Sequence, residues 1–204
     1  MTSAEIETPH GVARVHLDAV EGPRAALVLG HGAGGGVSAR DIVAAAEAAR
    51  AAGLSVALVE QPYRVAGRRS PAPAHQLDAA WTAVLERLRK KELRELPLVA
   101  GGRSSGARVA CRTAAATGAA GVLCLAFPLQ PPPRRSGKTA PSRLPELDAV
   151  AVPTLVVQGT RDPFGMPPKT KGRTVVGVTG DHSLRSDGAA IREAVEAWLA
   201  GLSI

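Results

Sequence analysis

Aromatic residues, cysteines and long apolar runs are all scarce in this sequence, and each shortage argues against a class of protein. Five aromatic side chains among 204 residues are too few to provide the stacking platforms that single-stranded nucleic acids need. No apolar run approaches the roughly 18 residues of a membrane-spanning helix, so no membrane association is expected. Cys111 and Cys124 have neither metal-ligand nor redox spacing, which predicts reduced cysteines in the core and no metal site.

Positive charge is plentiful, with a formal net charge of +7 and an isoelectric point near 10.2. Such an excess invites a nucleic-acid partner, but 20 of the 25 basic residues are arginines in a chain that is also rich in alanine, glycine and proline. A coding sequence rich in G and C gives the same bias, so nucleic acid is not an expected ligand. Residues 1–23 have early acids and no apolar segment of the secretory type, which favours a cytoplasmic location.

The order of apolar runs and helical patterns predicts an α/β fold. Length and a hydrophobic content of 45% favour one domain over residues 1–204 with a buried core. Short apolar runs alternate with amphipathic segments, as in a mostly parallel sheet of about 6–7 strands with helices on both faces. Strands are expected over 11–20, 25–30, 54–60, 96–102, 121–128, 152–160 and 172–180, and helices over 38–53, 74–91, 105–118 and 186–201.

Local signals mark the helix ends. Ser38 and Asp41 fit a capping box at the start of the first long helix. Gly53 and Gly118 stand where two of the helical patterns stop, as glycine does in left-handed C-terminal caps. These residues therefore predict where the chain enters and leaves the helices.

The sequence GRSSG at 102–106 fits the pattern G-x-S-x-G and lies between an apolar run and a helical pattern. In a nucleophile elbow a strand turns sharply into a helix, and the serine at the turn is strained and exposed. The residues two before and two after that serine must be small, because the two backbones nearly touch there. A frame centred on Ser105 would need glycine at the positions of Arg103 and Ala107. The spacing therefore assigns the nucleophile to Ser104 and favours an elbow over a plain Gly/Ser helix start.

A second glycine-rich segment, residues 27–36, also follows an apolar run. It resembles the oxyanion loops of esterases, in which small residues let backbone N–H groups face the oxygen of a tetrahedral intermediate. The N–H of Ala33 or of Gly32, together with that of Ser105, is expected to form this oxyanion site. His31 is expected to support the loop and not to act as a base.

The same segment has a competing interpretation. Gly30 to Gly35 match the dinucleotide-binding pattern G-x-G-x-x-G, and Glu60 ends the next expected strand. So many glycines make a chance match easy, and a helix that begins near Ser38 starts too late to hold Gly35 in its first turn. Dinucleotide binding is therefore a remote alternative, and no cofactor is expected.

An acid and a base follow the last two expected strands. Asp162 lies just past the strand at 152–160, and His182 lies just past the strand at 172–180. The chain order serine, aspartate, histidine is the one found in hydrolases with a G-x-S-x-G elbow. His182 would take the proton from Ser104, while Asp162 would hold the tautomer of the imidazole and stabilise its cation.

Other acids and histidines fit these roles less well. Asp181 is adjacent to His182 and is expected to point elsewhere in an extended turn, and Asp148 precedes its strand. The remaining histidines are expected to be surface or structural residues: His10, His16 and His75.

Two groups of basic residues have no acids among them. One group comprises Arg64, Arg68 and Arg69, and the other comprises Arg134, Arg135, Lys138 and Arg143 in the proline-rich loop 129–143. This loop is expected over the carboxyl ends of the strands, where ligands bind in open α/β sheets. Its Gly-Lys-Thr is not a P-loop, because Pro132 stands where that motif needs glycine. The simpler interpretation is a solvated surface, and the alternative is an electropositive rim that favours acidic substrates or partners.

Five segments together resemble a known family: VLGHGAGGG, GGRSSGARVA, FPLQPPPRRS, VPTLVVQGTRDPFG and GDHSL. They are similar to the α/β-hydrolase-like family of testis-expressed protein thirty. That family is shared with the third regulatory subunit of the non-specific lethal (NSL) chromatin complex and with small bacterial dienelactone-hydrolase-like proteins. The resemblance implies a compact α/β-hydrolase fold without a cap domain, with Ser104, Asp162 and His182 at the family's triad positions. Where the family often has a bulky residue after the nucleophile, this chain has Ser105.

These observations predict a bacterial serine hydrolase that acts on a small ester, thioester or lactone through an acyl-enzyme. The alternative is a scaffold or binding protein on a hydrolase fold, because one branch of the family works as a subunit of a complex. The expected partner is a small-molecule acyl substrate. The acyl group, the leaving group and the oligomeric state are left open by the sequence.

Overall fold

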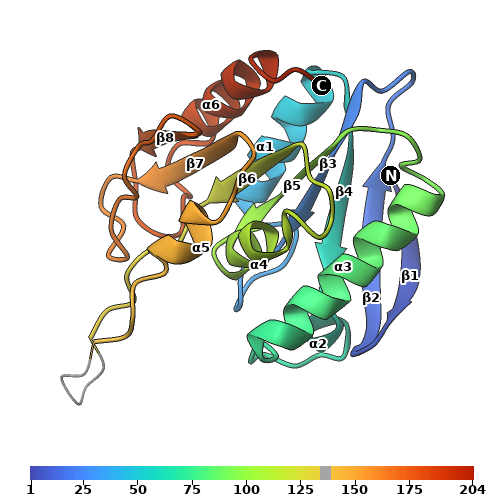
Figure 1. The fold of residues 1–204 in the computed structure, drawn as a ribbon, viewed down its shortest axis with the longest axis horizontal. Helices are drawn as coiled ribbons and strands as arrows, with labels where there is room; N and C mark the ends of the chain where they lie inside the picture. The colour runs from blue at the N-terminus through green and yellow to red at the C-terminus, as the bar shows by residue number, and fades with distance from the viewer. Residues whose placement is uncertain (134–138) are drawn as a thin grey trace.

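A computed structural model describes residues 1–133 and 139–204 of the chain. Its strands are β1 (Thr2–Thr8), β2 (Gly11–Asp18), β3 (Ala25–Gly30), β4 (Leu54–Glu60), β5 (Leu98–Arg103), β6 (Gly121–Leu125), β7 (Thr154–Gly159) and β8 (Arg173–Val178). Its helices are α1 (Arg40–Ala51), α2 (Pro62–Val65), α3 (Ala74–Lys90), α4 (Ser105–Thr113), α5 (Leu144–Asp148) and α6 (Gly188–Ala200). The strands form one sheet in the order β1-β2-β4-β3-β5-β6-β7-β8 (Figure 1).

The sheet is mostly parallel, as predicted. β1 pairs antiparallel with β2, and β2 pairs antiparallel with β4, while the neighbours from β4 to β8 all pair in parallel. The described residues form eight strands, more than the six or seven predicted. The additional strand is β1, in which Ile6 is the one buried residue. Its pairing depends on backbone hydrogen bonds to β2 at the edge of the sheet, so no apolar run reveals it in the sequence.

Helices cover both faces of the sheet, which confirms the predicted layers (Figure 1). On one face α3 and α4 bury Trp81, Leu85 and Val109 against the strands. On the other face α1 packs against α6 and against the sheet, and its buried residues include five alanines, Ala44, Ala45, Ala46, Ala48 and Ala49. Small side chains on α1 let the two helices approach closely, so a chain with few aromatic residues still closes its core.

The carboxyl ends of β3, β5, β7 and β8 all lie at one edge of the sheet. The register pairs Gly30 with Gly102 and Gly159 with Val178, so these strands end at nearly the same level. The segments that follow them are the glycine-rich loop, the serine turn and the two turns that contain Asp162 and His182. Strand topology therefore brings together chain segments that lie far apart in the sequence, at the edge where open α/β sheets bind ligands (Figure 1).

The predicted helix end is confirmed at Gly53, whereas α4 ends at Thr113, five residues before the predicted end at Gly118, and the predicted capping box is wrong. Gly53 and Gly118 have φ values of +78° and +60°, the left-handed conformation that glycine adopts without strain. The helix α1 begins at Arg40, and its N-cap residue, Ala39, provides no side-chain hydrogen bond. The expected box of Ser38 and Asp41 does not form, because Asp41 is buried and makes an ion pair with a residue of β5.

The cysteines and helices fit the remaining expectations of the sequence. Cys111 and Cys124 are free and buried, with their Sγ atoms 3.5 Å apart, which confirms them as reduced core residues. Their hydrogen bond, together with burial, raises the pKa of Cys124 well above its usual value, so this side chain stays a thiol. Among the helices described, none has the length and apolar character that crossing a lipid bilayer demands.

Candidate active site

Ser104 lies at a sharp turn between the end of β5 and the start of α4. Its φ of 51° and ψ of −105° are strained for a residue with a side chain, as expected of a nucleophile elbow. A Cβ atom on Gly102 would lie 2.6 Å from the carbonyl oxygen of Gly30, and one on Gly106 would lie 2.5 Å from the same oxygen. Strand and helix backbones therefore touch at this turn, and the physical reason for the G-x-S-x-G spacing is confirmed.

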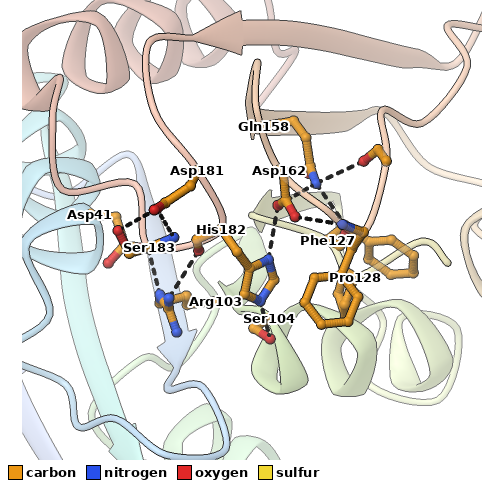
Figure 2. Close-up of polar contacts among 12 residues, drawn as sticks. Asp41, Arg103, Ser104, Phe127, Pro128, Gln158, Asp162, Asp181, His182 and Ser183 are labelled. Atoms are coloured by element: carbon orange, nitrogen blue, oxygen red, sulfur yellow. Dashed lines mark hydrogen bonds and ion pairs between the residues drawn. The ribbon is translucent and has the colours of Figure 1, made fainter. Parts of the chain in front are cut away.

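Three side chains that the sequence singled out form a hydrogen-bonded array (Figure 2). His182 Nε2 lies 2.9 Å from Ser104 Oγ, and His182 Nδ1 lies 2.8 Å from Asp162 Oδ2. A carboxylate can only accept, so Nδ1 holds the ring proton and Nε2 is free to accept from the serine hydroxyl. This tautomer suits His182 to remove the proton of Ser104.

Asp162 is held by a set of donors that the sequence did not reveal. Gln158 Nε2 donates to Asp162 Oδ2 at 2.8 Å, and the backbone N–H of Phe164 donates to Oδ1 at 2.9 Å. The same amide of Gln158 lies 3.1 Å from the carbonyl oxygen of Phe127, which anchors it to the chain after β6. Both oxygens of the buried carboxylate thus have partners, and its orientation toward His182 is fixed.

His182 sits in a tight turn that its neighbours build. Asp181 Oδ1 accepts from the backbone N–H of Ser183 at 2.8 Å and from its hydroxyl at 2.6 Å. These hydrogen bonds lower the pKa of Asp181, whose carboxylate supports the turn and does not face the imidazole, as predicted. Leu184 closes the turn with a φ of +48°, and the ring of Phe164 packs on the imidazole at a centroid distance of 4.4 Å.

A second buried carboxylate reaches the same turn through Arg103. Arg103 Nη2 donates to the backbone carbonyl of His182 at 2.9 Å, and its Nε lies 3.0 Å from Asp41 Oδ2 (Figure 2). Burial raises the pKa of Asp41, and the charge of Arg103 opposes that rise. The sequence did not suggest this contact, because Arg103 appeared there only as a variable position of the elbow and Asp41 as a helix cap.

His31 supports the glycine-rich loop, in keeping with its predicted role. Its Nε2 accepts from the backbone N–H of Gln61 at 3.1 Å, so Nδ1 holds the proton and donates to the carbonyl oxygen of Gly32 at 2.8 Å. Burial lowers the pKa of His31, which favours this neutral form. Tyr63 adds a hydrogen bond from its hydroxyl to the carbonyl oxygen of Ala33 at 3.0 Å.

The backbone donors expected at the oxyanion site border Ser104. A Cβ atom on Gly32 would lie 3.6 Å from the Cβ of Ser104, so this part of the loop lies against the serine. Within residues 1–133 and 139–204, the N–H groups of Ala33 and Ser105 have no protein acceptor. Ser105 begins α4, where the helix dipole favours negative charge. These N–H groups are therefore available to an oxygen that develops charge beside Ser104.

The other candidates of the sequence lie away from this array. The helix α1 starts five residues after Gly35, which leaves no helix N-terminus for the dinucleotide pattern at Gly30–Gly35. His10 packs edge-on against His75, and His16 faces Glu60, while Asp148 pairs with Arg173. In the part of the chain that the structure describes, no three potential metal ligands gather.

The structure describes only part of the two groups of basic residues that the sequence singled out. Arg134, Arg135 and Lys138 lie outside the described residues. Arg143 donates to the carbonyl oxygen of Pro128 at 3.2 Å and helps to close the base of the loop. Arg68 and Arg69 are exposed.

An eight-stranded sheet with a nucleophile elbow at its carboxyl edge has the architecture of an α/β hydrolase. The chain belongs to the alpha/beta hydrolase domain family, whose model matches residues 23–197. No curated protein sequence matches it.

Solved structures with the same fold include serine hydrolases. XC6422 of Xanthomonas campestris, an α/β serine hydrolase without a lid, has 20% identity and a TM-score of 0.75, covering 100% of this chain and 95% of that one. A dienelactone hydrolase of Anabaena variabilis has 15% identity and a TM-score of 0.77, covering 98% and 97%. Est1E of Butyrivibrio proteoclasticus, solved with ferulic acid, has 16% identity and a TM-score of 0.74, covering 97% and 98%. At these identities the likeness concerns the fold.

Proposed function

We propose that this protein is a serine hydrolase in which Ser104 attacks the carbonyl carbon of a small ester, thioester or lactone. The observation that supports this most is the continuous array from Ser104 Oγ through the imidazole of His182 to the buried carboxylate of Asp162. A protein that only binds a partner has no need of this alignment or of a strained serine at its centre.

The reaction would proceed in two halves. In the first, Ser104 Oγ bonds to the carbonyl carbon while His182 Nε2 takes the hydroxyl proton, and the bond to the leaving group then breaks as His182 returns that proton to it. In the second, His182 takes a proton from water, the resulting hydroxide attacks the acyl carbon, and the acid leaves as Ser104 regains its hydrogen. The N–H groups of Ser105 and of Ala33 or Gly32 would hold the oxyanion in both halves.

The absence of a long helix between β6 and β7 in the described residues favours small substrates. The one helix described between β6 and β7 is α5, which has five residues, too short to cover the serine as a lid. The resemblance to the family of testis-expressed protein thirty and its dienelactone-hydrolase-like bacterial members points the same way, as does the dienelactone hydrolase among the similar structures. The scaffold function known in one branch of that family is the competing proposal.

An activity-based probe separates these two possibilities. A fluorophosphonate probe followed by mass spectrometry of the labelled peptide should place the label on Ser104. Ser104→Ala should abolish the labelling, whereas Ser105→Ala should keep most of it. A folded wild-type protein that takes up no label, or one labelled on Ser105, would overturn the proposal and favour a scaffold.

A further inference from the structure

A cavity of about 450 Å³ lies at the start of α1, between the glycine-rich loop, Arg103 and the turn that contains Ser183. Three arginines and two serines line it, Arg40, Arg103, Arg185, Ser38 and Ser183, together with the backbone of Gly34 and Gly35. Its arginine and serine lining suits a polar group of a ligand and not an apolar chain.

The lining residues are neighbours of the proposed catalytic groups. Arg103 directly precedes Ser104, and Ser183 directly follows His182. Gly34 follows Ala33, whose N–H is one of the oxyanion donors proposed above. The cavity therefore lies beside the segments that bear the proposed catalytic groups, although Ser104 itself is not among its lining residues.

The charge of the cavity is strongly positive. Arg103 is compensated by the buried carboxylate of Asp41, and none of the lining residues is acidic. In the described part of the chain, Arg40 and Arg185 take part in no salt bridge. The acids close to these residues in sequence have other partners: Asp41 pairs with Arg103, Asp181 accepts from Ser183, and Asp187 accepts from the backbone N–H of Ala190. Two guanidinium groups thus face a polar cavity without a counter-charge from the protein.

We infer that this cavity binds an anionic group of the substrate, a carboxylate or a phosphate. The inference rests on the proposed function, and it defines the substrate as an acyl ester or thioester with a negative charge on its acyl part or on its leaving group. Planar guanidinium groups bind the oxygens of both anions through paired hydrogen bonds. The serine hydroxyls and the N–H groups of the glycine-rich loop add neutral donors on the remaining sides.

Matched pairs of esters test this inference. In one arm, the 4-nitrophenyl monoester of glutaric acid is compared with 4-nitrophenyl pentanoate, which lacks the terminal carboxylate. In the other arm, 4-acetoxyphenyl phosphate is compared with 4-methoxyphenyl acetate, so that the charge lies on the leaving group. The quantity measured is the ratio of kcat/KM for the anionic ester to that for the neutral ester, at low ionic strength where exposed arginines act fully.

The decisive variant is Arg40→Gln/Arg185→Gln, with Lys90→Gln/Arg94→Gln as the charge-matched control. Lys90 and Arg94 are exposed near the end of α3, before β5 begins, so the control removes two charges far from the carboxyl edge of the sheet. The ratio should fall about tenfold or more in the cavity variant in at least one arm, since charge-assisted hydrogen bonds are lost, and should stay constant in the control. The arm with the larger fall identifies the source of the anion.

A binding measurement keeps the cavity testable without turnover. Calorimetric titration with inorganic phosphate should show binding to the wild-type protein and to the control, and a loss of binding in Arg40→Gln/Arg185→Gln. If no ester is hydrolysed, the proposed function fails while this titration still decides whether the cavity takes an anion. A ratio that is unchanged in both arms while neutral esters turn over, or phosphate binding that survives the substitutions, would overturn the inference.

Discussion

Two buried aspartates flank His182, and the molecule uses them in different ways. Asp162 contacts the imidazole directly and has further donors from Gln158 and the backbone of Phe164. Asp41 forms an ion pair with the guanidinium of Arg103, and Arg103 in turn donates to the backbone carbonyl of His182. One carboxylate orients the ring that would move protons, and the other holds the backbone that bears the ring.

The two buried carboxylates thus have different roles at one site: Asp162 has a role in the proposed reaction, and Asp41 has a structural role. The carboxylate of Asp162 stands where the positive charge of an imidazolium would develop, so its own charge belongs to the proposed chemistry. The burial that raises the pKa of Asp41 means that its charge costs free energy in the folded state, which Arg103 repays only in part. We therefore expect changes at Asp162 to affect the rate most and changes at Asp41 to affect stability in a pH-dependent way.

The largest effect is expected for Asp162→Asn. An amide in this place no longer stabilises the imidazolium and favours the wrong tautomer of His182, so kcat for a neutral ester should fall by about 10³–10⁴. The measurement is steady-state kinetics with 4-nitrophenyl acetate. The matched control is Asp181→Asn, which keeps an acceptor for Ser183 and should stay within about threefold of the wild type, because that carboxylate supports only the turn. Equal losses of kcat in the two variants would contradict the assignment of different roles to Asp162 and Asp181.

Arg103→Gln should have the next largest effect. Loss of the hydrogen bond to the carbonyl of His182 frees the turn, and a displacement of about 1 Å at the base costs about 10–100-fold in kcat. KM for a neutral ester should change little, because Arg103 would touch the imidazole turn and not the ester group. Arg103→Lys keeps the charge beside Asp41 but lacks the second donor nitrogen, so it should recover stability more fully than kcat. Full recovery of kcat in Arg103→Lys would show that the charge alone, and not the bond to His182, is what matters.

Asp41→Asn should change the pH dependence of folding stability, an effect that distinguishes Asp41 from Asp162. Because the folded state raises the pKa of Asp41, the folded protein holds a proton that the unfolded chain has lost. The stability that Asp41 contributes is therefore fully present below its ordinary pKa of 3.8 and is lost as the pH rises through the folded value. The free energy of unfolding of Asp41→Asn, measured relative to that of the wild type, should therefore increase as the pH rises through this window. The increase should be at most about 1.4 kcal/mol per pH unit. Urea unfolding between pH 3.5 and pH 7, followed by tryptophan fluorescence, measures the difference, and a constant gap would refute the assignment.

The smallest effect is expected for Ser105→Ala. The proposed role of this residue belongs to its backbone N–H, and the loss of its hydroxyl leaves that donor in place at the first turn of α4. Activity toward a neutral ester and labelling by the probe should stay within about threefold of the wild type. A loss comparable to that of Arg103→Gln would assign the hydroxyl a role in the reaction.

The layered fold and the meeting of three side chains were predictable because they depend on short-range patterns. Apolar runs marked the parallel strands, and a loop at the end of each strand had to lie at the same edge of the sheet. The spacing of Gly102 and Gly106 was enough to select Ser104, since it expresses a contact between two backbones. β1 escaped notice because one buried residue, Ile6, leaves no pattern to recognise.

The supporting contacts were not predictable, since they depend on the tertiary structure, and the pairings of Asp41 with Arg103 and of Gln158 with Phe127 join residues that are distant in the chain. Asp41 fits a local helix cap by sequence, but the pairing with Arg103 prevails once β5 and α1 are neighbours in the fold. Gln158 looks like an ordinary strand residue until its amide is seen between Asp162 and the carbonyl of Phe127. The cavity at the start of α1 likewise draws its arginines from three separate segments, so no window of sequence contains it.

The close approach of Gly30, Gly102 and Gly106 has a consequence for how this protein can change over time. Any side chain at the last two positions would collide with the carbonyl oxygen of Gly30, so the centre of the site tolerates no variation there. Most of the residues that line the cavity, by contrast, lie on loops whose backbones are not locked in this way, and the exceptions are Arg40 in α1 and Arg103 in β5. Evolution or engineering can therefore alter which ligands are selected by exchanging loop side chains, while the attacking geometry is inherited unchanged.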